Sequence, residues 1–327
     1  MSKLNRTVSM APMMDCTDRH DRYFLRLISK NVLLYTEMIV SEAIDRGDKK
    51  KLLEFNVKEK PVALQLGGSS PKLLANATKI GEDFGYDEIN LNVGCPSKKV
   101  KSGNFGVFLM KDIPLLSKCI KAIQRKINIP LTVKCRIGVD DYEGSKFLNN
   151  FVYQLSDIGI STFAIHARKA ISGLDTKRNR SIPPLEYHRV YEIKQKFPDL
   201  NIVINGGIDS IKEIENHLNH VDGVMVGRKI YSDPLFLCEI DEHLFTGNSH
   251  SPIVSLNNFM EYILTLENKN DVNRAITHLM QLLKSLSIQK TQRNKLLTSL
   301  KDNSFNMGDL FKDFQVDLLQ KNPIPNL

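Results

Sequence analysis

The chain of 327 residues contains no tryptophan and only five cysteines. The cysteines are scattered and none forms a C-x-x-C pair, which argues against a disulfide framework and a structural zinc site and favours a reducing compartment. No apolar run reaches the roughly 18 residues of a membrane-spanning helix. Residues Met1–Met10 also lack an apolar run of signal-peptide length. From these absences we expect a cytoplasmic protein with no membrane partner.

Positive charge is in excess, with 45 Lys and Arg against 37 Asp and Glu and a formal net charge of +8. Such a surplus favours polyanionic partners, although many basic proteins bind none. The hydrophobic share of 42% and the charged share of 25% are ordinary for soluble domains, so we expect a sizeable core and no extensive disorder.

Up to about residue 235, short apolar runs alternate with segments of helical periodicity, such as Ser70–Phe84 and Ile113–Ile127. Runs that are apolar nearly throughout are typical of buried parallel strands. The eight runs are Val8–Met13, Leu33–Ile39, Val62–Gly67, Glu88–Gly94, Leu131–Gly138, Thr162–Arg168, Asn201–Gly207 and Gly223–Arg228. Eight such βα units favour an α/β fold of the TIM (β/α)8 barrel type. An open doubly wound sheet is the alternative, but no G-x-G-x-x-G follows the first strand.

The pattern changes after about residue 245. The sequence GNSHSP (247–252) predicts a linker, and residues 256–319 have helical periodicity and are rich in Lys, Asn and Leu. We therefore predict a barrel domain at residues 1–245 and a small all-α domain with a basic surface at residues 246–327.

In a TIM barrel, functional groups gather at the carboxyl ends of the strands. The predicted strands deliver many polar residues there: Gln65, Asn92, Lys134, Arg136, His166, Arg168 and Asn205. The last two strands end in Gly206-Gly207 and Gly227-Arg228, and we expect a helix to start after each pair. Backbone amides at such ends can approach a phosphate closely, so we predict a phosphate site.

Lys134 emerges from a buried strand, where an unpaired ammonium is costly. The electron-rich edge of a reduced flavin is one possible partner, and a barrel carboxylate such as Glu37 is the alternative. His166 has no matched second histidine or carboxylate, so we predict a hydrogen-bonding role for it and no metal site.

Cys95 follows the fourth predicted strand, in a tight loop between Gly94 and Pro96. A thiol held there can act as a nucleophile or a general acid, and the alternative is a small buried hydrophobe. We expect Cys119 and Cys135 to be of the buried kind.

Two loops of the predicted catalytic face are basic: one carries Lys98, Lys99 and Lys101, the other Arg168, Lys169, Lys177, Arg178 and Arg180. This arrangement suits a substrate with many phosphates, although a charge run is usually only a solvated face.

Several longer motifs are more specific: MAPMMDCTDRHDRYF, LQLGG, DEINLNVGCPSKKVKSGNFGVFLM, TVKCRIG, FAIHARKA, INGGI and DGVMVGR. Together they resemble the tRNA-dihydrouridine synthases over roughly residues 7–240, and most of all the A subfamily, which acts on D-loop positions 20 and 20a. The chain departs from that subfamily in having no tryptophan at Cys16 or in the loop after HARKA, and in residues 284–297, KSLSIQKTQRNKLL. These departures concern tRNA docking rather than the chemistry at Cys95.

The resemblance implies a barrel that binds FMN, NADPH as the reductant, and a helical domain that binds tRNA, with uridine reduced at its C5–C6 bond. It implies that Pro12, Met13 and Met14 lie beside the flavin, that Gln65, Lys134 and His166 bond its ring, and that Asn205, Gly206, Gly207, Gly227 and Arg228 hold its phosphate. It further implies that Cys95 is the proton donor, that Asn92 contacts the target nucleotide, and that Lys177, Arg180 and Arg293 contact tRNA.

Two other functions remain open. One is an FMN-dependent barrel that acts on a free pyrimidine, like a dihydroorotate dehydrogenase, which would need neither a net charge of +8 nor a basic helical domain. The other is a non-catalytic tRNA-binding protein, against which the intact set of Gln65, Lys134, His166 and Arg228 argues. We expect a monomer that binds tRNA and no DNA.

Overall fold

The computed structural model describes residues 4–245 and 251–302. Within these ranges the strands form a single parallel sheet in the order β1-β9-β8-β7-β6-β5-β4-β2, with β3 paired to β4. The strands are β1 (Val8–Met10), β2 (Leu34–Tyr35), β3 (Ile39–Val40), β4 (Val62–Gly67), β5 (Glu88–Val93), β6 (Leu131–Arg136), β7 (Thr162–His166), β8 (Asn201–Asn205) and β9 (Gly223–Val226).

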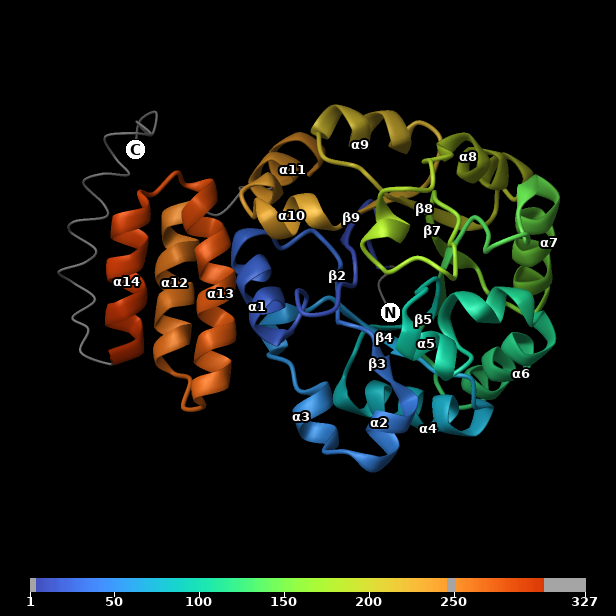
Figure 1. Ribbon diagram of the computed structural model, residues 1–327, viewed down its shortest axis with the longest axis horizontal. Helices are drawn as coiled ribbons and strands as arrows, with labels where there is room; N and C mark the ends of the chain where they lie inside the picture. Colours follow the sequence, from blue (N-terminus) through green and yellow to red (C-terminus); the bar gives the residue numbers. More distant parts are fainter. Residues whose placement is uncertain (1–3, 246–250, 303–327) are drawn as a thin grey trace.

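The sheet closes on itself between β1 and Leu33, the residue before β2. Met10 N donates to Leu33 O (2.9 Å) and Leu33 N donates to Val8 O (3.2 Å). Figure 1 shows the strands at the centre of a ring of helices. The prediction of a TIM barrel is thereby confirmed, and the open sheet is excluded.

The second predicted strand, Leu33–Ile39, is interrupted in the structure. Gln65 N donates to the Thr36 hydroxyl (3.0 Å) where a backbone carbonyl of the neighbouring strand would otherwise accept. Because the Thr36 side chain interrupts the ladder with β4, the run divides into β2 and β3. Met38, between them, lines the cavity at the barrel mouth.

Helices follow the strands around the barrel. They are α1 (Arg19–Ile28), α2 (Ser41–Arg46), α3 (Lys49–Leu53), α4 (Pro71–Phe84), α5 (Lys98–Ser102), α6 (Ile113–Gln124), α7 (Gly144–Asp157), α8 (Tyr187–Lys196), α9 (Ile211–Leu218), α10 (Arg228–Ser232) and α11 (Phe236–Leu244), with 3-10 turns at Val57–Glu59, Gly106–Lys111 and Arg178–Arg180. Helix α4 begins where the sequence predicts, because the Ser70 hydroxyl caps it. No helix of the described ranges is both long and apolar enough to cross a membrane.

Three further helices, α12 (Pro252–Leu264), α13 (Lys269–Ser285) and α14 (Lys290–Asp302), form a bundle beside α1. Figure 1 shows α13 nearest the barrel and α14 farthest from it. The predicted helical region is thereby confirmed. The predicted linker, apart from its last two residues, and residues 303–319 lie outside the described ranges, and the division at residues 245 and 246 stays a prediction.

The bundle packs on α1 through aromatic side chains. The rings of Phe24 and Phe259 lie 4.6 Å apart between centroids, and those of Tyr23 and Tyr262 stack at 4.1 Å. Both phenylalanines are fully buried. An apolar interface of this kind joins the bundle to the barrel as one packed body.

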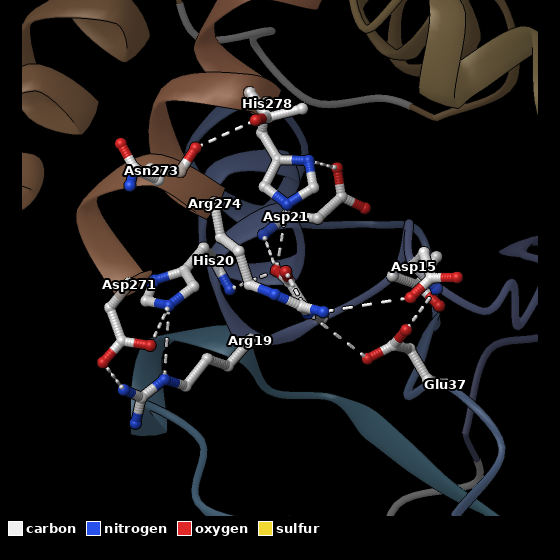
Figure 2. A network of polar contacts seen from close by, with 12 residues as sticks. Asp15, Arg19, His20, Asp21, Glu37, Asp271, Asn273, Arg274 and His278 are labelled. Atoms are coloured by element: carbon white, nitrogen blue, oxygen red, sulfur yellow. Dashed lines mark hydrogen bonds and ion pairs between the residues drawn. The ribbon is translucent and has the colours of Figure 1, made fainter. Parts of the chain in front are cut away.

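Beside the aromatic contacts lies a buried polar network around Asp18, the residue that caps α1 (Figure 2). The Asp18 carboxylate accepts from His278 Nε2 (3.0 Å) and from Arg274 (3.0 Å), both on α13. Burial alone would raise the pKa of Asp18, but the hydrogen bond and charge of His278 outweigh it and hold that pKa well below its usual range.

The same contact shifts the histidine in the opposite sense. Burial would lower the pKa of His278, but its hydrogen bond to Asp18 and the charge of Asp21 outweigh burial and raise it. Burial also raises the pKa of Asp21 to about 7, so Asp18 is the carboxylate that pairs with His278 in mildly acidic solution. Arg274 lies 3.9 Å from both Asp15 and Glu37, and Asp15 lines the cavity at the barrel mouth. Figure 2 shows the Arg274 side chain directed toward these two carboxylates.

We predict that His278→Gln destabilises the protein more in mild acid than in base. A histidine whose folded-state pKa is raised stabilises the fold fully below its ordinary pKa of about 6.5, and this contribution is lost as pH rises through the folded-state pKa. Urea unfolding at about pH 5.5 should show a loss of roughly 1–3 kcal/mol, and the loss should shrink at about pH 9. His243→Gln, at an exposed position of α11, is the control. Equal destabilisation at both pH values would contradict the assignment.

Candidate active site

A cavity of about 390 Å³ opens at the carboxyl ends of the barrel strands, within the range usual for ligand pockets. It brings together every residue predicted to be catalytic or to bind the cofactor, along with Asn92 and Arg180. The predicted residues that line it are Pro12, Met13, Met14, Gln65, Asn92, Cys95, Lys134, His166, Arg180, Asn205, Gly206, Gly207, Gly227 and Arg228.

Lys134 is a cation without a carboxylate partner among the described residues. Its Nζ donates to Asn205 Oδ1 (3.0 Å), and Asn205 is oriented by its own bond from Nδ2 to Met225 O (2.7 Å). Glu37, the alternative partner considered from the sequence, lies beside Arg274 instead. Burial and the charge of Arg136 lower the pKa of Lys134 to about 8. The ammonium is therefore available to an anionic or strongly accepting group in the cavity.

His166, at the end of β7, is neutral at physiological pH. Burial lowers its pKa well below the usual value, and the positive charges of Arg136 and Lys134 lower it further. A neutral imidazole has one donor and one acceptor nitrogen, so His166 can hydrogen bond to a ligand in either sense. This fits the predicted hydrogen-bonding role.

The loop that carries Cys95 is held from both sides. Asn92 Oδ1 accepts from Gly94 N (3.1 Å) and Cys95 N (2.9 Å), and Arg136 Nε donates to Gly94 O (3.0 Å). Val107 N donates to Cys95 O (3.1 Å). The thiol is only partly buried and lines the cavity, so it is accessible to a bound substrate.

Cys119, on α6, and Cys135, on β6, are of the buried kind, as predicted. Cys119 and Cys135 are fully buried. Burial raises the pKa of Cys119 to about 11 and that of Cys135 to about 12. Both therefore stay protonated and unreactive at neutral pH.

The glycines that follow β8 allow a ligand to approach the backbone closely. Gly206 and Gly207 have φ angles of +122° and +75°. A Cβ on Gly206 would come within 2.6 Å of the His166 ring, and one on Gly207 within 2.6 Å of Leu185. Both positions therefore exclude side chains and keep backbone exposed to a ligand.

A helix follows each of the last two strand ends, as predicted, but the two helices begin at different distances from the glycines. Helix α10 begins at Arg228, immediately after Gly227. Helix α9 begins at Ile211, because Ser210 supplies its cap by accepting from Glu213 N (3.4 Å), so residues 208–210 separate it from Gly207. The phosphate site itself stays a prediction.

One residue that the sequence does not single out organises the basic loop after β7. Asn179 is fully buried, accepts from Ile171 N (2.8 Å), and donates to the carbonyls of Ile171 and Leu174 (2.9 Å each). Arg136 donates to Asn179 O (3.1 Å) from the other side. Since Asn179 stands between two arginines in the sequence, no local pattern identifies it as buried.

Arg136 thus joins two functional loops. Its guanidinium donates a hydrogen bond to Gly94 O, next to Cys95. It also donates to Lys169 O (3.2 Å) and Asn179 O in the basic loop. Arg180 of that loop lines the cavity, and Lys177 is exposed outside it. The third predicted tRNA contact, Arg293, lies on α14, the helix farthest from the barrel (Figure 1).

Metal chemistry finds no support in the described ranges. No group of three or more His, Cys, Asp or Glu side chains there could hold a metal ion.

Comparisons with known proteins bear on this site. Residues 9–316 match the family model described as dihydrouridine synthase (Dus). The chain is 46% identical over 296 residues to the tRNA-dihydrouridine(20/20a) synthase of Synechocystis sp., covering 89% of each protein. It is 54% identical over 239 residues to the enzyme of the same name from Escherichia coli K12, covering 72% of this chain and 69% of that one.

Among solved structures, the fold is similar to that of a 2-naphthoyl-CoA reductase in complex with 2-naphthoyl-CoA. The TM-score is 0.56 at 10% sequence identity, and the match covers 72% of this chain and 50% of the reductase. A similarity at this level of identity concerns the fold alone.

We predict that Asn179→Ala loosens the basic loop. The change removes three partly buried hydrogen bonds, so the loop should open more often and trypsin should cut at Lys177, Arg178 or Arg180 about tenfold faster. Limited proteolysis with mass spectrometry of the fragments measures this rate. Asn150→Ala, on the exposed face of α7, is the control. Cleavage at the wild-type rate would show that Asn179 does not hold the loop.

Proposed function

The chain belongs to the dihydrouridine synthase family, and on that premise we propose that it reduces uridine in the tRNA D-loop, at positions 20 and 20a, to 5,6-dihydrouridine. The family consists of oxidoreductases that act on uridine in tRNA, and the chain is an enzyme of this kind. One observation supports the position and the chemistry of this proposal: the accessible Cys95 thiol and the Lys134 ammonium line the same cavity. In the described part of the chain, this ammonium has no carboxylate partner.

The cavity residues fit FMN as the cofactor. Lys134 offers a cation to an accepting ring edge, while the exposed backbone of Gly206 and Gly207 and the guanidinium of Arg228 suit a phosphate. When bound, FMN would supply the hydride that uridine C6 accepts, with NADPH as the reductant.

Each wall of the cavity then has a role toward the cofactor. Pro12, Met13 and Met14 border it from the β1 side, where they can pack on a flat ring. Gln65, Lys134 and His166 contribute hydrogen bonds to the ring. Asn205 holds the Lys134 ammonium in place, and Gly227 lets the backbone of the last strand come close to the phosphate.

Cys95 would hold the proton that uridine C5 receives. Lys134 and Arg136 are cationic side chains that line the same cavity as Cys95. Asn92 fixes the loop by accepting from Cys95 N, and its Nδ2 keeps one hydrogen that no described residue accepts. We assign that hydrogen to the target nucleotide.

The substrate is a polyanion, and the cavity rim carries matching charge. Lys177 and Arg180 lie on the loop that Asn179 and Arg136 hold, where they can bind phosphates beside the extruded base. Extrusion of a base costs a few kcal/mol, and less where it is already unpaired, as in a loop. We assign residues 246–327, including Arg293, to a tRNA-binding domain, and expect a cytoplasmic monomer that binds neither DNA nor membranes.

We predict that Cys95→Ala keeps the flavin spectrum and the oxidation of NADPH but lowers dihydrouridine formation by about 10²–10⁴-fold, as for loss of a general acid. Mass spectrometry of tRNA after a single turnover measures the product. Cys238→Ala, a partly buried cysteine on α11, is the control.

Full activity of Cys95→Ala would remove Cys95 from the mechanism. Turnover of free uridine or orotate by the wild-type protein without tRNA would favour the small-molecule reductase instead. Binding of tRNA with no bound flavin would favour the non-catalytic RNA-binding protein.

A further inference from the structure

A line of hydrogen-bonded polar side chains runs through the interior of the barrel, below the proposed active site. Glu88, Asn90 and Asn92 alternate along β5 and therefore share its inner face. Glu88 lies about 13 Å along the strand from Asn92. All three are buried, and Glu88 Oε2 accepts from Arg6 Nε (3.0 Å) at the amino end of the barrel.

The lower end of the line has only one possible direction. A carboxylate paired with an arginine accepts hydrogen bonds and donates none, so the Thr132 hydroxyl (2.6 Å) and the Tyr35 hydroxyl (2.7 Å) both donate to Glu88 Oε1. The Thr132 oxygen must then accept from Asn90 Nδ2 (2.8 Å). With its amide so oriented, Asn90 presents Oδ1 to Gln65 Nε2 (2.8 Å).

The upper end requires the same direction independently. Backbone N–H groups only donate, so Asn92 must turn Oδ1 toward Gly94 N and Cys95 N. Its Nδ2 then donates to Gln65 Oε1 (2.8 Å), which leaves Gln65 Nε2 for Asn90. Reversal of any one amide would set two donors or two acceptors face to face inside the barrel, where unsatisfied groups are most costly.

The direction matters at Gln65 and at Cys95. Gln65 uses one Nε2 hydrogen on Asn90, and its second is accepted by no residue of the described ranges. Because Gln65 lines the cavity, this hydrogen makes the side chain a donor toward a ligand. The same orientation lets Asn92 hold the backbone of Cys95.

We propose that Glu88 is a positioning residue for the reaction at the far end of the barrel: through Thr132 it fixes which way the Asn90 amide faces, and so gives Gln65 Nε2 the acceptor that holds Gln65 in the orientation Asn92 also requires. This inference rests on the proposed function for what Gln65 and Cys95 do. It assigns a catalytic consequence to a carboxylate that touches neither substrate nor cofactor.

Glu88→Gln is the variant that reverses the direction of the hydrogen bonds between position 88, Thr132 and Asn90. The Arg6 guanidinium selects the carbonyl oxygen of the new amide, so its NH2 group faces the hydroxyl oxygens of Thr132 and Tyr35. Thr132 thereby loses its acceptor at residue 88. The Asn90 side chain (2.8 Å) is nearer to the Thr132 hydroxyl than Ile89 O (3.5 Å), so we expect Thr132 to donate to Asn90 and the Asn90 amide to flip, while the backbone N–H groups still fix Asn92. The conflict falls on Gln65. We expect the Kd for FMN to rise about tenfold, the visible flavin band to shift, and kcat with tRNA to fall with its KM unchanged.

The decisive comparison is the double variant Glu88→Gln with Thr132→Val. Valine has no hydroxyl, so it cuts the lower end from Asn90 and leaves the direction to the upper end. FMN affinity and kcat should recover to within about threefold of wild type, although the melting temperature should fall further because another buried hydrogen bond is lost. A merely structural role of Glu88 would instead make the double variant worse in every measurement.

Ser9→Ala, a buried substitution on β1 outside the line, is the control and should match wild type. Full-length apoprotein titrated with FMN, the spectrum of the loaded protein, and steady-state kinetics with tRNA supply the readouts. Wild-type values in Glu88→Gln, or no recovery in the double variant, would overturn the inference. If the wild-type protein bound no FMN, the proposed function itself would fail, and that outcome is distinct from both.

Discussion

Closure of one parallel sheet is the constraint on which the rest of the structure depends. Because every strand runs the same way and β1 meets Leu33 through two backbone hydrogen bonds, the carboxyl ends of all strands face a single cavity. Residues as far apart in sequence as Pro12 and Arg228 therefore share its lining. The interior of the barrel is partly polar, and its line of amides connects the Arg6–Glu88 ion pair at one end with the Cys95 loop at the other.

Two separate sets of hydrogen bonds connect the parts of the protein that we assign to the substrate and the cofactor. Arg136 joins the Cys95 loop to the basic loop through three carbonyls, so the groups assigned to the base and to the phosphates move together. The helical bundle is linked separately: Arg274 and His278 of α13 bind Asp18, the cap of α1, directly after the loop of Met13 and Met14. The bundle is thereby connected to the side of the cavity where we expect the flavin ring.

Much of this could be predicted from the sequence, because its strongest signals are local. Apolar runs predict the strands, and the rule that barrels work at their strand ends selects Gln65, Lys134, His166 and Cys95 without further information. What could not be predicted depends on distant partners. Asp18 and His278 are 260 residues apart, and Asn179 reads as one polar residue in a charged run. The division of the second strand depends on one Thr36 hydroxyl, and the direction of the interior amides depends on Glu88 together with the backbone of Cys95.

The most direct test of the central claim is the product on tRNA. Transfer RNA from cells that lack the gene is treated with the purified protein and NADPH, and each D-loop position is analysed by mass spectrometry. The account predicts that dihydrouridine at positions 20 and 20a is missing beforehand and present afterwards. Dihydrouridine formed only at other positions would contradict the assigned site while keeping the chemistry. No dihydrouridine from a protein that holds FMN would contradict the account itself.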